Sequence, residues 1–254
     1  MKLNKILAAG LIAASSASSM AAIIVPATGN SELVLLLWDS TAKVSYVKDL
    51  GIQIDSFDPT ASLSFVVNDT YFTSFLNIAN AVTVDDFTFS VLGGDNLAAG
   101  GKRLFSTSNN PVTVLSGSQN TNSNNFIGDM TAKQNIGPSP KGDHSATLNG
   151  SSYAVEGEVA YVGALGQNLG NTNPWLSGNV IGTDSTFRSF TSANTSGTQA
   201  TQVLFDGIWS FKNTNGVYTA EYNVAAIPEG DGIAMGLAGL GALGFVALRR
   251  RQSK

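Results

Sequence analysis

The chain contains no cysteine and only one histidine, and its basic side chains are few. Without cysteine it has neither a disulfide framework nor thiolate chemistry. A zinc site would need carboxylates for all ligands but one, which is unusual. Residues 23–226 carry eight lysines and arginines against sixteen aspartates and glutamates, so the formal charge of this body is −8. Such a balance repels phosphate backbones, and no basic stripe offsets it, which argues against nucleic-acid binding.

The amino terminus has the three regions of a secretory signal peptide. Two lysines lie within the first five residues, an apolar run follows at Ile6–Ala14, and small side chains dominate positions 15–22. A run of nine residues is too short to cross about 30 Å of hydrocarbon. We therefore expect a signal peptide over residues 1–22 that is cut after Ala21 or Ala22. The alternative is an N-terminal anchor that stays attached.

The carboxyl terminus combines a short apolar segment with a basic end. No charged side chain lies in 233–248, and Arg249, Arg250 and Arg251 follow directly. A helix over this segment would span about 24 Å, and thinning of the bilayer or snorkelling of the arginines would make up the shortfall. Because arginines beside a span stay cytoplasmic, we expect everything before Pro228 to lie outside, as the signal peptide also requires.

This tail resembles a known sorting signal. Pro228 and Glu229, the Gly/Ala/Leu-rich helix 233–248 and the basic tail 249–254 are together similar to the PEP-CTERM signal of Gram-negative bacteria. In that family an exosortase, an integral membrane enzyme of the cysteine transpeptidase type, recognises the tail and cuts near Pro-Glu-Pro. Members are associated with exopolysaccharide, biofilm or floc matrix. This chain departs from the pattern at Gly230, where proline is usual.

The resemblance is confined to residues 227–254 and is silent about the body's activity. It implies that the protein is tethered transiently in the inner membrane and then sorted to the cell surface or the extracellular matrix. Two other interpretations of the tail remain, a plain stop-transfer anchor and a buried helix of the folded domain. The second is disfavoured because a uniformly apolar helix has no polar face to show to water.

The sequence pattern of residues 23–226 predicts strands separated by turns. Its apolar residues recur with a period near two, or in short bursts bounded by Gly, Asn, Asp and Ser, which is typical of β-strands. The expected strands are Glu32–Trp38, Lys43–Tyr46, Gly51–Ile54, Ser62–Val67, Ala81–Val84, Phe87–Leu92, Val112–Leu115, Tyr153–Gly163, Gln202–Phe205, Ile208–Phe211 and Val217–Val224. Asn215-Gly216 predicts a hairpin between the last two. We expect a mainly β fold, an antiparallel β-sandwich or jelly roll.

One helix and several long loops complete this prediction. Asp69 and Thr70 are candidate caps for a short helix over Tyr71–Asn80, whose apolar side chains are spaced for one buried face. Three other segments are rich in Asn, Ser, Thr and Gly and have too few apolar side chains to form core, so they are expected as exposed loops. These segments are Ser116–Asn125, Asn168–Asn173 and Ser192–Gln199.

The residues that could carry chemistry are sparse. A nucleophilic triad needs a histidine that contacts a serine and is oriented by a carboxylate. His144 is the only histidine, and Asp143 is its neighbour in sequence, hence poorly placed to hold its imidazole. No Gly-x-Ser-x-Gly elbow occurs. We expect a solvated loop histidine, no catalytic residue and no enzymatic activity.

Acidic pairs offer a second possibility. Glu156 and Glu158 alternate onto one face of an expected strand, with about 6.5–7 Å between their Cα atoms, a spacing that can suit glycoside hydrolysis. A solvated acidic strand face explains the pair as well, and this is the interpretation we favour. Asp85-Asp86 and Asp55–Asp58 are further sources of oxygen ligands for calcium, but no acidic calcium loop or repeat is present. No cofactor or metal is expected, with calcium as a weak alternative.

The three tryptophans can stack on sugar rings if they are exposed. Trp38 and Trp209 lie inside expected strands and are predicted to be core. Trp175 follows Pro174 in an Asn/Gly-rich segment, so it is the candidate for glycan contact. The leading hypothesis is a non-enzymatic exported protein with a structural or adhesive role in exopolysaccharide or biofilm. The alternatives are a carbohydrate-binding module and, less favoured, a polysaccharide-active hydrolase.

Overall fold

The computed structural model of the chain describes residues 22–24, 31–81, 83–97, 101–107, 116–134, 141–144, 147–162, 178–193 and 199–224. The chain divides into two compact units, Met1–Asn223 and Val224–Lys254. All described residues except Val224 belong to the first unit. Within the described ranges, no helix is both long and apolar enough to cross a membrane.

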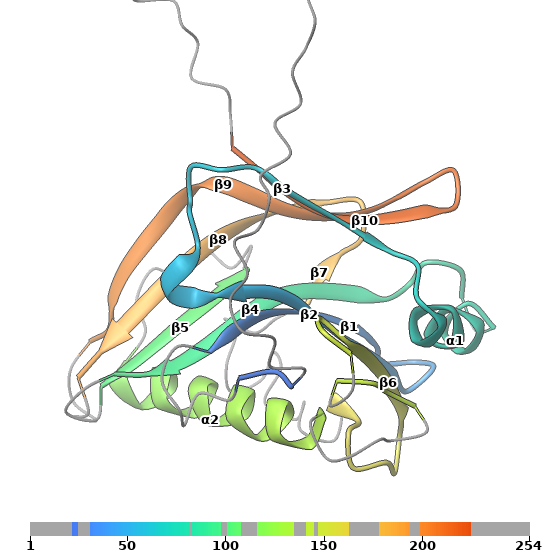
Figure 1. Cartoon of the computed structure of the whole chain (residues 1–254), viewed down its shortest axis with the longest axis horizontal. Helices are drawn as coiled ribbons and strands as arrows, with labels where there is room; N and C mark the ends of the chain where they lie inside the picture. The colour runs from blue at the N-terminus through green and yellow to red at the C-terminus, as the bar shows by residue number, and fades with distance from the viewer. Residues whose placement is uncertain are drawn as a thin grey trace, which may run out of the picture. The chain divides into compact units, whose positions relative to one another are not determined.

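The described residues form one antiparallel sheet of ten strands with two α-helices and a short 3-10 helix (Figure 1). The strands are β1 (Glu32–Asp39), β2 (Val44–Gln53), β3 (Leu63–Val67), β4 (Thr88–Asn96), β5 (Lys102–Thr107), β6 (Ser151–Val155), β7 (Asn179–Val180), β8 (Asp184–Ser192), β9 (Thr201–Thr214) and β10 (Val217–Asn223). The helices are α1 (Thr70–Ala79), α2 (Gly117–Gln134) and η2 (Ile54–Ser56). The strand order is β3-β10-β9-β8-β5-β4-β1-β2-β6, and β7 pairs with β4 beside this path.

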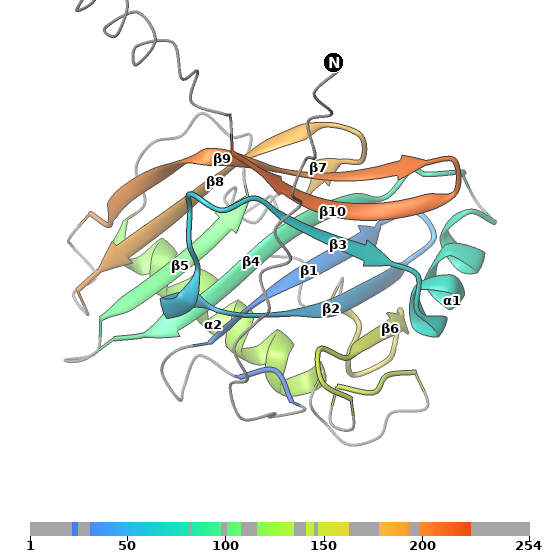
Figure 2. The ribbon, with the colours of Figure 1, turned by 45° about the horizontal axis from the view of Figure 1, so that its top comes forward.

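The sheet is strongly curled. In Figures 1 and 2, β9, β10 and β3 arch over β4, β1 and β2, so the sheet has the form of a half-barrel. Phe89 of β4 and Phe211 of β9 lie 6.3 Å apart between ring centroids, although β5 and β8 separate their strands in the sheet. These two rings therefore meet across the concave interior.

The mainly β prediction is confirmed, but the predicted sandwich is not what the described residues form. A sandwich packs two separate sheets face to face, whereas hydrogen bonding here runs without a break from β3 to β6. The two facing walls are the two ends of one sheet. β5 and β8 connect these walls, and neither is among the predicted strands.

Several strand boundaries differ from the prediction. β2 joins the predicted strands Lys43–Tyr46 and Gly51–Ile54, and β9 joins Gln202–Phe205 and Ile208–Phe211. The strand continues through Lys48 and Asp49 because both pair with β1, opposite Leu35 and Val34. The predicted strand Ala81–Val84 is wrong, because residues 81 and 83–85 form turns and a bend. The predicted strand Val112–Leu115 lies outside the described residues.

Aromatic side chains fill the concave face. The fully buried ones on this face are Tyr46, Phe75, Phe87, Phe89, Phe187, Trp209, Phe211 and Tyr222. Phe190 is also fully buried, but it belongs to the convex-face cluster described below. Trp209 packs against Tyr222 with 5.5 Å between ring centroids, which confirms Trp209 as core. α1 closes one end of this interior with Phe72 and Phe75. The predicted helix start is confirmed, since the Asp69 side chain accepts a hydrogen bond from the Phe72 N–H.

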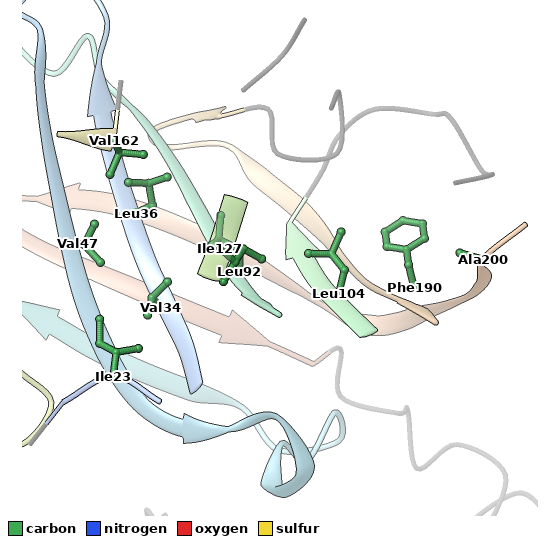
Figure 3. Close-up of a cluster of buried hydrophobic side chains, with 10 residues drawn as sticks. All are labelled: Ile23, Val34, Leu36, Val47, Leu92, Leu104, Ile127, Val162, Phe190 and Ala200. Atoms are coloured by element: carbon green, nitrogen blue, oxygen red, sulfur yellow. The ribbon is translucent and has the colours of Figure 1, made fainter. Parts of the chain in front are cut away.

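α2 packs on the convex face, across β4, β5 and β8. Ile127 of this helix joins an apolar cluster that includes Leu92 and Leu104 (Figure 3). The prediction that Ser116–Asn125 is an exposed loop is wrong, because most of this segment is the first half of α2. The helix is docked by polar side chains: Asn120 is buried and donates from Nδ2 to the Lys102 carbonyl at 3.0 Å and to Ser192 Oγ at 2.7 Å.

The hairpin between β9 and β10 is confirmed. Thr214 pairs with Val217, which leaves a two-residue loop of Asn215 and Gly216 with φ of 54° and 85°. Positive φ at both loop positions is the geometry that an Asn-Gly step tolerates best. The Asn-Gly step was therefore sufficient to predict this hairpin from the sequence.

Candidate functional site

Polar side chains converge where α1 begins against β2 and β6. Tyr46 and Lys48 come from β2, Ser151 comes from β6, and Asp69 caps α1; we call these four residues the Asp69 cluster. They meet because β2 pairs with β6 in a register that sets Tyr46 opposite Tyr153 and Lys48 opposite Ser151, and because α1 packs on both strands.

Asp69 is the centre of this cluster. Its Oδ1 accepts from the Phe72 N–H at 2.9 Å and from Ser151 Oγ at 2.7 Å. Its Oδ2 accepts from Tyr46 Oη at 2.6 Å and lies 3.7 Å from Lys48 Nζ. Burial acts to raise the pKa of Asp69, but the hydrogen bond from Tyr46 and the other donors hold this pKa below 3.8.

The same contacts keep the Tyr46 hydroxyl protonated. Burial, and after it the negative charge of Asp69, raises the pKa of Tyr46 well above 10. At neutral pH the carboxylate is therefore ionised and the phenol is neutral, and neither changes state within several pH units. The Asp69 cluster suits the fastening of a helix to a sheet edge, and it has no group poised for proton transfer near pH 7.

His144 is buried, so the prediction of a solvated histidine is wrong. Its exposed fraction is 1%, and its Nε2 lies 3.2 Å from Ser152 Oγ. The preceding residues pair with the edge of β6, through Tyr153 N to the Lys141 carbonyl at 2.9 Å and Asp143 N to the Ser151 carbonyl at 3.0 Å. Burial lowers the pKa of His144 to about 4, so the imidazole is neutral at pH 7.

The serine and histidine contact does not complete a triad. The Asp143 carboxylate accepts from the Ser151 N–H at 2.8 Å, and His144 Nδ1 has no hydrogen-bond partner in the part of the chain that the structure describes. A triad base requires a carboxylate on that nitrogen. Ser152 is also only 5% exposed, which leaves a substrate no access to its hydroxyl. His144 and Ser152 therefore form a buried polar contact between packed side chains.

Glu156 and Glu158 do not share a strand face, contrary to the sequence prediction. β6 ends at Val155, and both glutamates lie in the turn that follows. Glu156 pairs with Lys43 at 2.6 Å, and Glu158 pairs with Lys141. The turn reverses at Gly157, whose φ is +91°. Each carboxylate is thus held by its own lysine, and the geometry of paired catalytic acids is not formed here.

The candidate calcium ligands are engaged elsewhere. Asp85 accepts from Tyr218 Oη at 2.6 Å and from Asn213 Nδ2 at 3.0 Å, and Asp55 pairs with Arg103. Across the described ranges, no three histidine, aspartate or glutamate side chains are grouped so that they could hold a metal ion.

A buried acidic pair was not predicted. Glu32 of β1 is 9% exposed and Asp49 of β2 is 1% exposed. Asp49 pairs with Val34 across the strands, and Val34 follows Glu32 by two residues, so both carboxylates lie on the convex face. Glu32 Oε2 accepts from the Ile24 N–H at 2.9 Å, and Asp49 Oδ1 accepts from the Gly51 N–H at 2.8 Å.

This pair has unusual electrostatics. Burial, reinforced by the charge of Asp49, raises the pKa of Glu32 to about 7, and burial raises the pKa of Asp49. The sequence signal that could have found the pair is a single acidic residue in each of two neighbouring segments that are otherwise largely apolar.

The remaining predicted site residues belong to segments outside the described ranges. Trp175, the sorting motif Pro228, Glu229 and Gly230, and the basic stop Arg249, Arg250 and Arg251 all lie outside the described residues, as do residues 1–21 of the expected signal peptide. Trp38 is described and is half-buried, with its Nε1 donating to Tyr161 Oη at 3.4 Å.

Comparison of the chain with protein-family models, with curated proteins and with solved structures found no match in any of the three.

Proposed function

We propose that this chain is an exported, non-enzymatic protein of the cell surface or extracellular matrix, with a structural or adhesive role in exopolysaccharide or biofilm. The observation that carries the proposal is the pairing of two terminal patterns on one chain. A signal-peptide pattern occupies 1–22, and 227–254 combine a Pro-Glu step, an apolar segment and three arginines. Both patterns support a body, residues 23–226, that lies outside the cytoplasm.

In this proposal the terminal segments are processed one after the other. The signal peptide directs export, the helix 233–248 holds the chain in the inner membrane, and an exosortase-type enzyme cuts near Pro228. Gly230 replaces the usual proline of the sorting motif, so this position sets how efficiently the enzyme processes the chain. The body, residues 23–226, is carried to the outer side of the membrane and takes no part in export, membrane retention or cleavage.

The body's architecture is compatible with a structural role. With no cysteine to cross-link it, it depends on continuous strand pairing and on a dense aromatic interior. The polar side chains described above hold elements together: Asp69 fastens α1, Asn120 docks α2, and Lys43 holds Glu156. These contacts favour a rigid module over one with a mobile reactive centre.

Intact-mass analysis of protein from the membrane and the medium, with and without the exosortase, tests the proposal. We expect a membrane species and a released species, both beginning at Ala22 or Ile23, the released one ending near Pro228 and disappearing without the enzyme. The variant Pro228→Ala/Glu229→Ala should remain in the membrane, whereas Asp206→Asn on the body surface should be released normally. Full-length, soluble chain inside the cell with both termini intact would contradict the proposal.

A second candidate, a carbohydrate-binding module, is favoured by one sequence observation. Trp175 follows Pro174 in a segment rich in Asn and Gly, and an exposed indole can stack on a sugar ring. A glycan array probed with the processed protein distinguishes the two candidates. Binding that Trp175→Ala abolishes and Pro174→Ala preserves would favour the second candidate over a purely structural role.

A further inference from the structure

The residues just after the predicted signal-peptide cut belong to the folded body. Ile23 is 2% exposed and packs in the convex-face cluster with Val34 and Val47 (Figure 3). The next residue, Ile24, donates its backbone N–H to Glu32 Oε2 at 2.9 Å. The segment 22–24 is therefore held against β1 by both an apolar side chain and a charged acceptor.

That acceptor belongs to a carboxylate pair that no lysine or arginine of the described ranges bonds. Glu32 and Asp49 lie on the same face of neighbouring strands, and the charge of Asp49 helps to raise the pKa of Glu32. Among the described residues, no lysine or arginine forms an ion pair with either carboxylate. Lys48 acts on Asp49 only through its longer-range charge. Buried like charges of this kind are unfavourable unless a cation joins them.

Cleavage after Ala22 creates a cation beside this pair. Water adds across the Ala22–Ile23 peptide bond: the C–N bond breaks, Ala22 leaves as a carboxylate, and the Ile23 nitrogen becomes an α-ammonium group. Successive backbone nitrogens are about 3–4 Å apart, so the new charge forms about 3–4 Å from the Ile24 nitrogen that already bonds Glu32. Because the Ile24 nitrogen is 2.9 Å from Glu32 Oε2, the ammonium group lies within about 7 Å of that oxygen even in the most extended arrangement. An opposite charge within about 4–6 Å favours the ionised carboxylate.

We propose that removal of the signal peptide completes the fold, because the new α-ammonium group of Ile23 forms an ion pair with Glu32 and supplies a positive charge that no described lysine or arginine brings to the Glu32–Asp49 pair. The inference rests on the export step of the proposed function. If the ion pair forms, the folded state of the precursor is less stable than that of the processed chain. This suits a polypeptide that must cross a membrane before it folds.

Four chains test the ion pair. One begins at Ile23, released from a fusion that leaves no extra residue, and one begins at Ser19 and so keeps the four native residues before the cut. Both end at Lys254, are held in the same mild detergent, and carry either Glu32 or Glu32→Gln, in which the amide oxygen can still accept from Ile24. Stability is measured by urea unfolding at pH 7, with Glu221→Gln on β10 as the matched control.

We expect the unfolding equilibrium constant of the Ile23 chain to be lower than that of the Ser19 chain by about tenfold or more, since one unit of pKa corresponds to a factor of ten. Glu32→Gln should remove this difference, and Glu221→Gln should preserve it. A difference that persists in Glu32→Gln would mean that packing of the shorter end, and not its charge, is responsible. Equal stability of the two starting chains would also overturn the proposal.

The α-amine itself gives a second readout. Its acylation at pH 7, followed by mass spectrometry of the N-terminal peptide, should be at least about tenfold slower in the Ile23 chain than in its Glu32→Gln variant. Equal rates would show that the amine is not paired with Glu32. The fusion fixes the first residue of the chain, so equal acylation rates would reject the ion pair without bearing on export. Failure of the export proposal would instead appear in the intact mass of the protein that cells make.

Discussion

At the scale of single residues, two buried groups have large pKa shifts between pH 4 and 7, and they act on stability in opposite directions. Burial lowers the pKa of His144 from 6.5 to about 4, and burial with the charge of Asp49 raises the pKa of Glu32 from 4.5 to about 7. Both shifts favour the neutral form of the side chain in the folded state. Because the two pH windows overlap, the effects partly cancel in the wild-type chain and must be separated by substitution.

His144→Gln should flatten the loss of stability in acid. Between pH 6.5 and 4 the unfolded chain binds a proton at this position and the folded chain does not, so wild-type stability falls as pH falls through this window, by up to about 3 kcal/mol. Glutamine removes the proton uptake. Urea unfolding at several pH values from 7 to 4 should show a smaller slope for the variant. An unchanged slope would place the acid sensitivity elsewhere.

Glu32→Gln should have the reverse dependence in a chain that keeps residues 19–22. Here the folded state binds the proton more tightly than the unfolded state, so wild-type stability falls as pH rises from about 4.5 to 7, by up to about 3 kcal/mol. The variant should therefore equal the wild type near pH 4 and exceed it at pH 8. Thermal unfolding at the two pH values measures this, and a variant less stable at pH 8 would contradict it.

At the scale of elements, α1 depends on one carboxylate. Asp69→Ala removes the cap on the Phe72 N–H and leaves Tyr46 Oη and Ser151 Oγ without their acceptor. Loss of a cap costs about 1 kcal/mol, and buried donors left unsatisfied add about 1–3 kcal/mol. Circular dichroism during urea unfolding should give a total near 3 kcal/mol. Asp69→Asn, which can still cap, should lose clearly less, and equal losses would rule out the capping role.

α2 depends on a close approach to β4. A Cβ at Gly94 would lie 2.6 Å from Asn124 Oδ1 and 3.2 Å from Ile127 Cδ1, so Gly94→Ala should push the helix from the sheet at a cost of about 1–3 kcal/mol. Hydrogen exchange of the α2 amides should quicken. Adding Asn124→Ala should recover part of the loss by freeing space. If the second substitution instead adds its full cost, the contact at Gly94 does not control docking.

At the scale of the whole molecule, an aromatic cluster inside the curled sheet joins the connecting strands β5 and β8 to one wall and to the chain after β2. Phe187 of β8 is fully buried and packs against Phe105, Trp209 and Tyr222 at centroid distances of 5.9, 6.0 and 6.1 Å. Phe57, which follows η2, joins it at 5.3 Å. The cluster therefore connects β5, β8, β9, β10 and the chain after β2.

Phe187→Ala should destabilise the body as a unit by about 3–5 kcal/mol, the usual cost of an aromatic core truncation. Tryptophan fluorescence reports the transition, because Trp209 lies in the same cluster. Val203→Ala is the matched control, since this side chain of β9 is 50% exposed and should cost less than about 0.5 kcal/mol. A loss of similar size in both variants would argue against a shared core in which Phe187 joins these strands.

Prediction from sequence succeeded where the cause of structure is local. Period-two patterns located β1, β3, β4 and β10, the Asp69 cap located α1, and Asn215-Gly216 located a hairpin. Each depends on a few neighbouring residues, whose backbone preferences act without the rest of the chain. The terminal signals stay predictions, and they depend on properties of short segments in the same way, namely length, apolarity and flanking charge.

Only the tertiary structure decided the rest, because it depends on pairing between distant segments. The segment that begins α2 has the composition of a loop, and it becomes a helix on the convex face because partners such as the Lys102 carbonyl and Ser192 receive its Asn120. His144, Glu32 and Asp49 carry polar side chains that composition would expose, yet strand pairing covers them and so moves the pKa of each. The choice of one curled sheet over two stacked sheets also follows from β5 and β8, which hydrogen-bond the two walls into one continuous ladder.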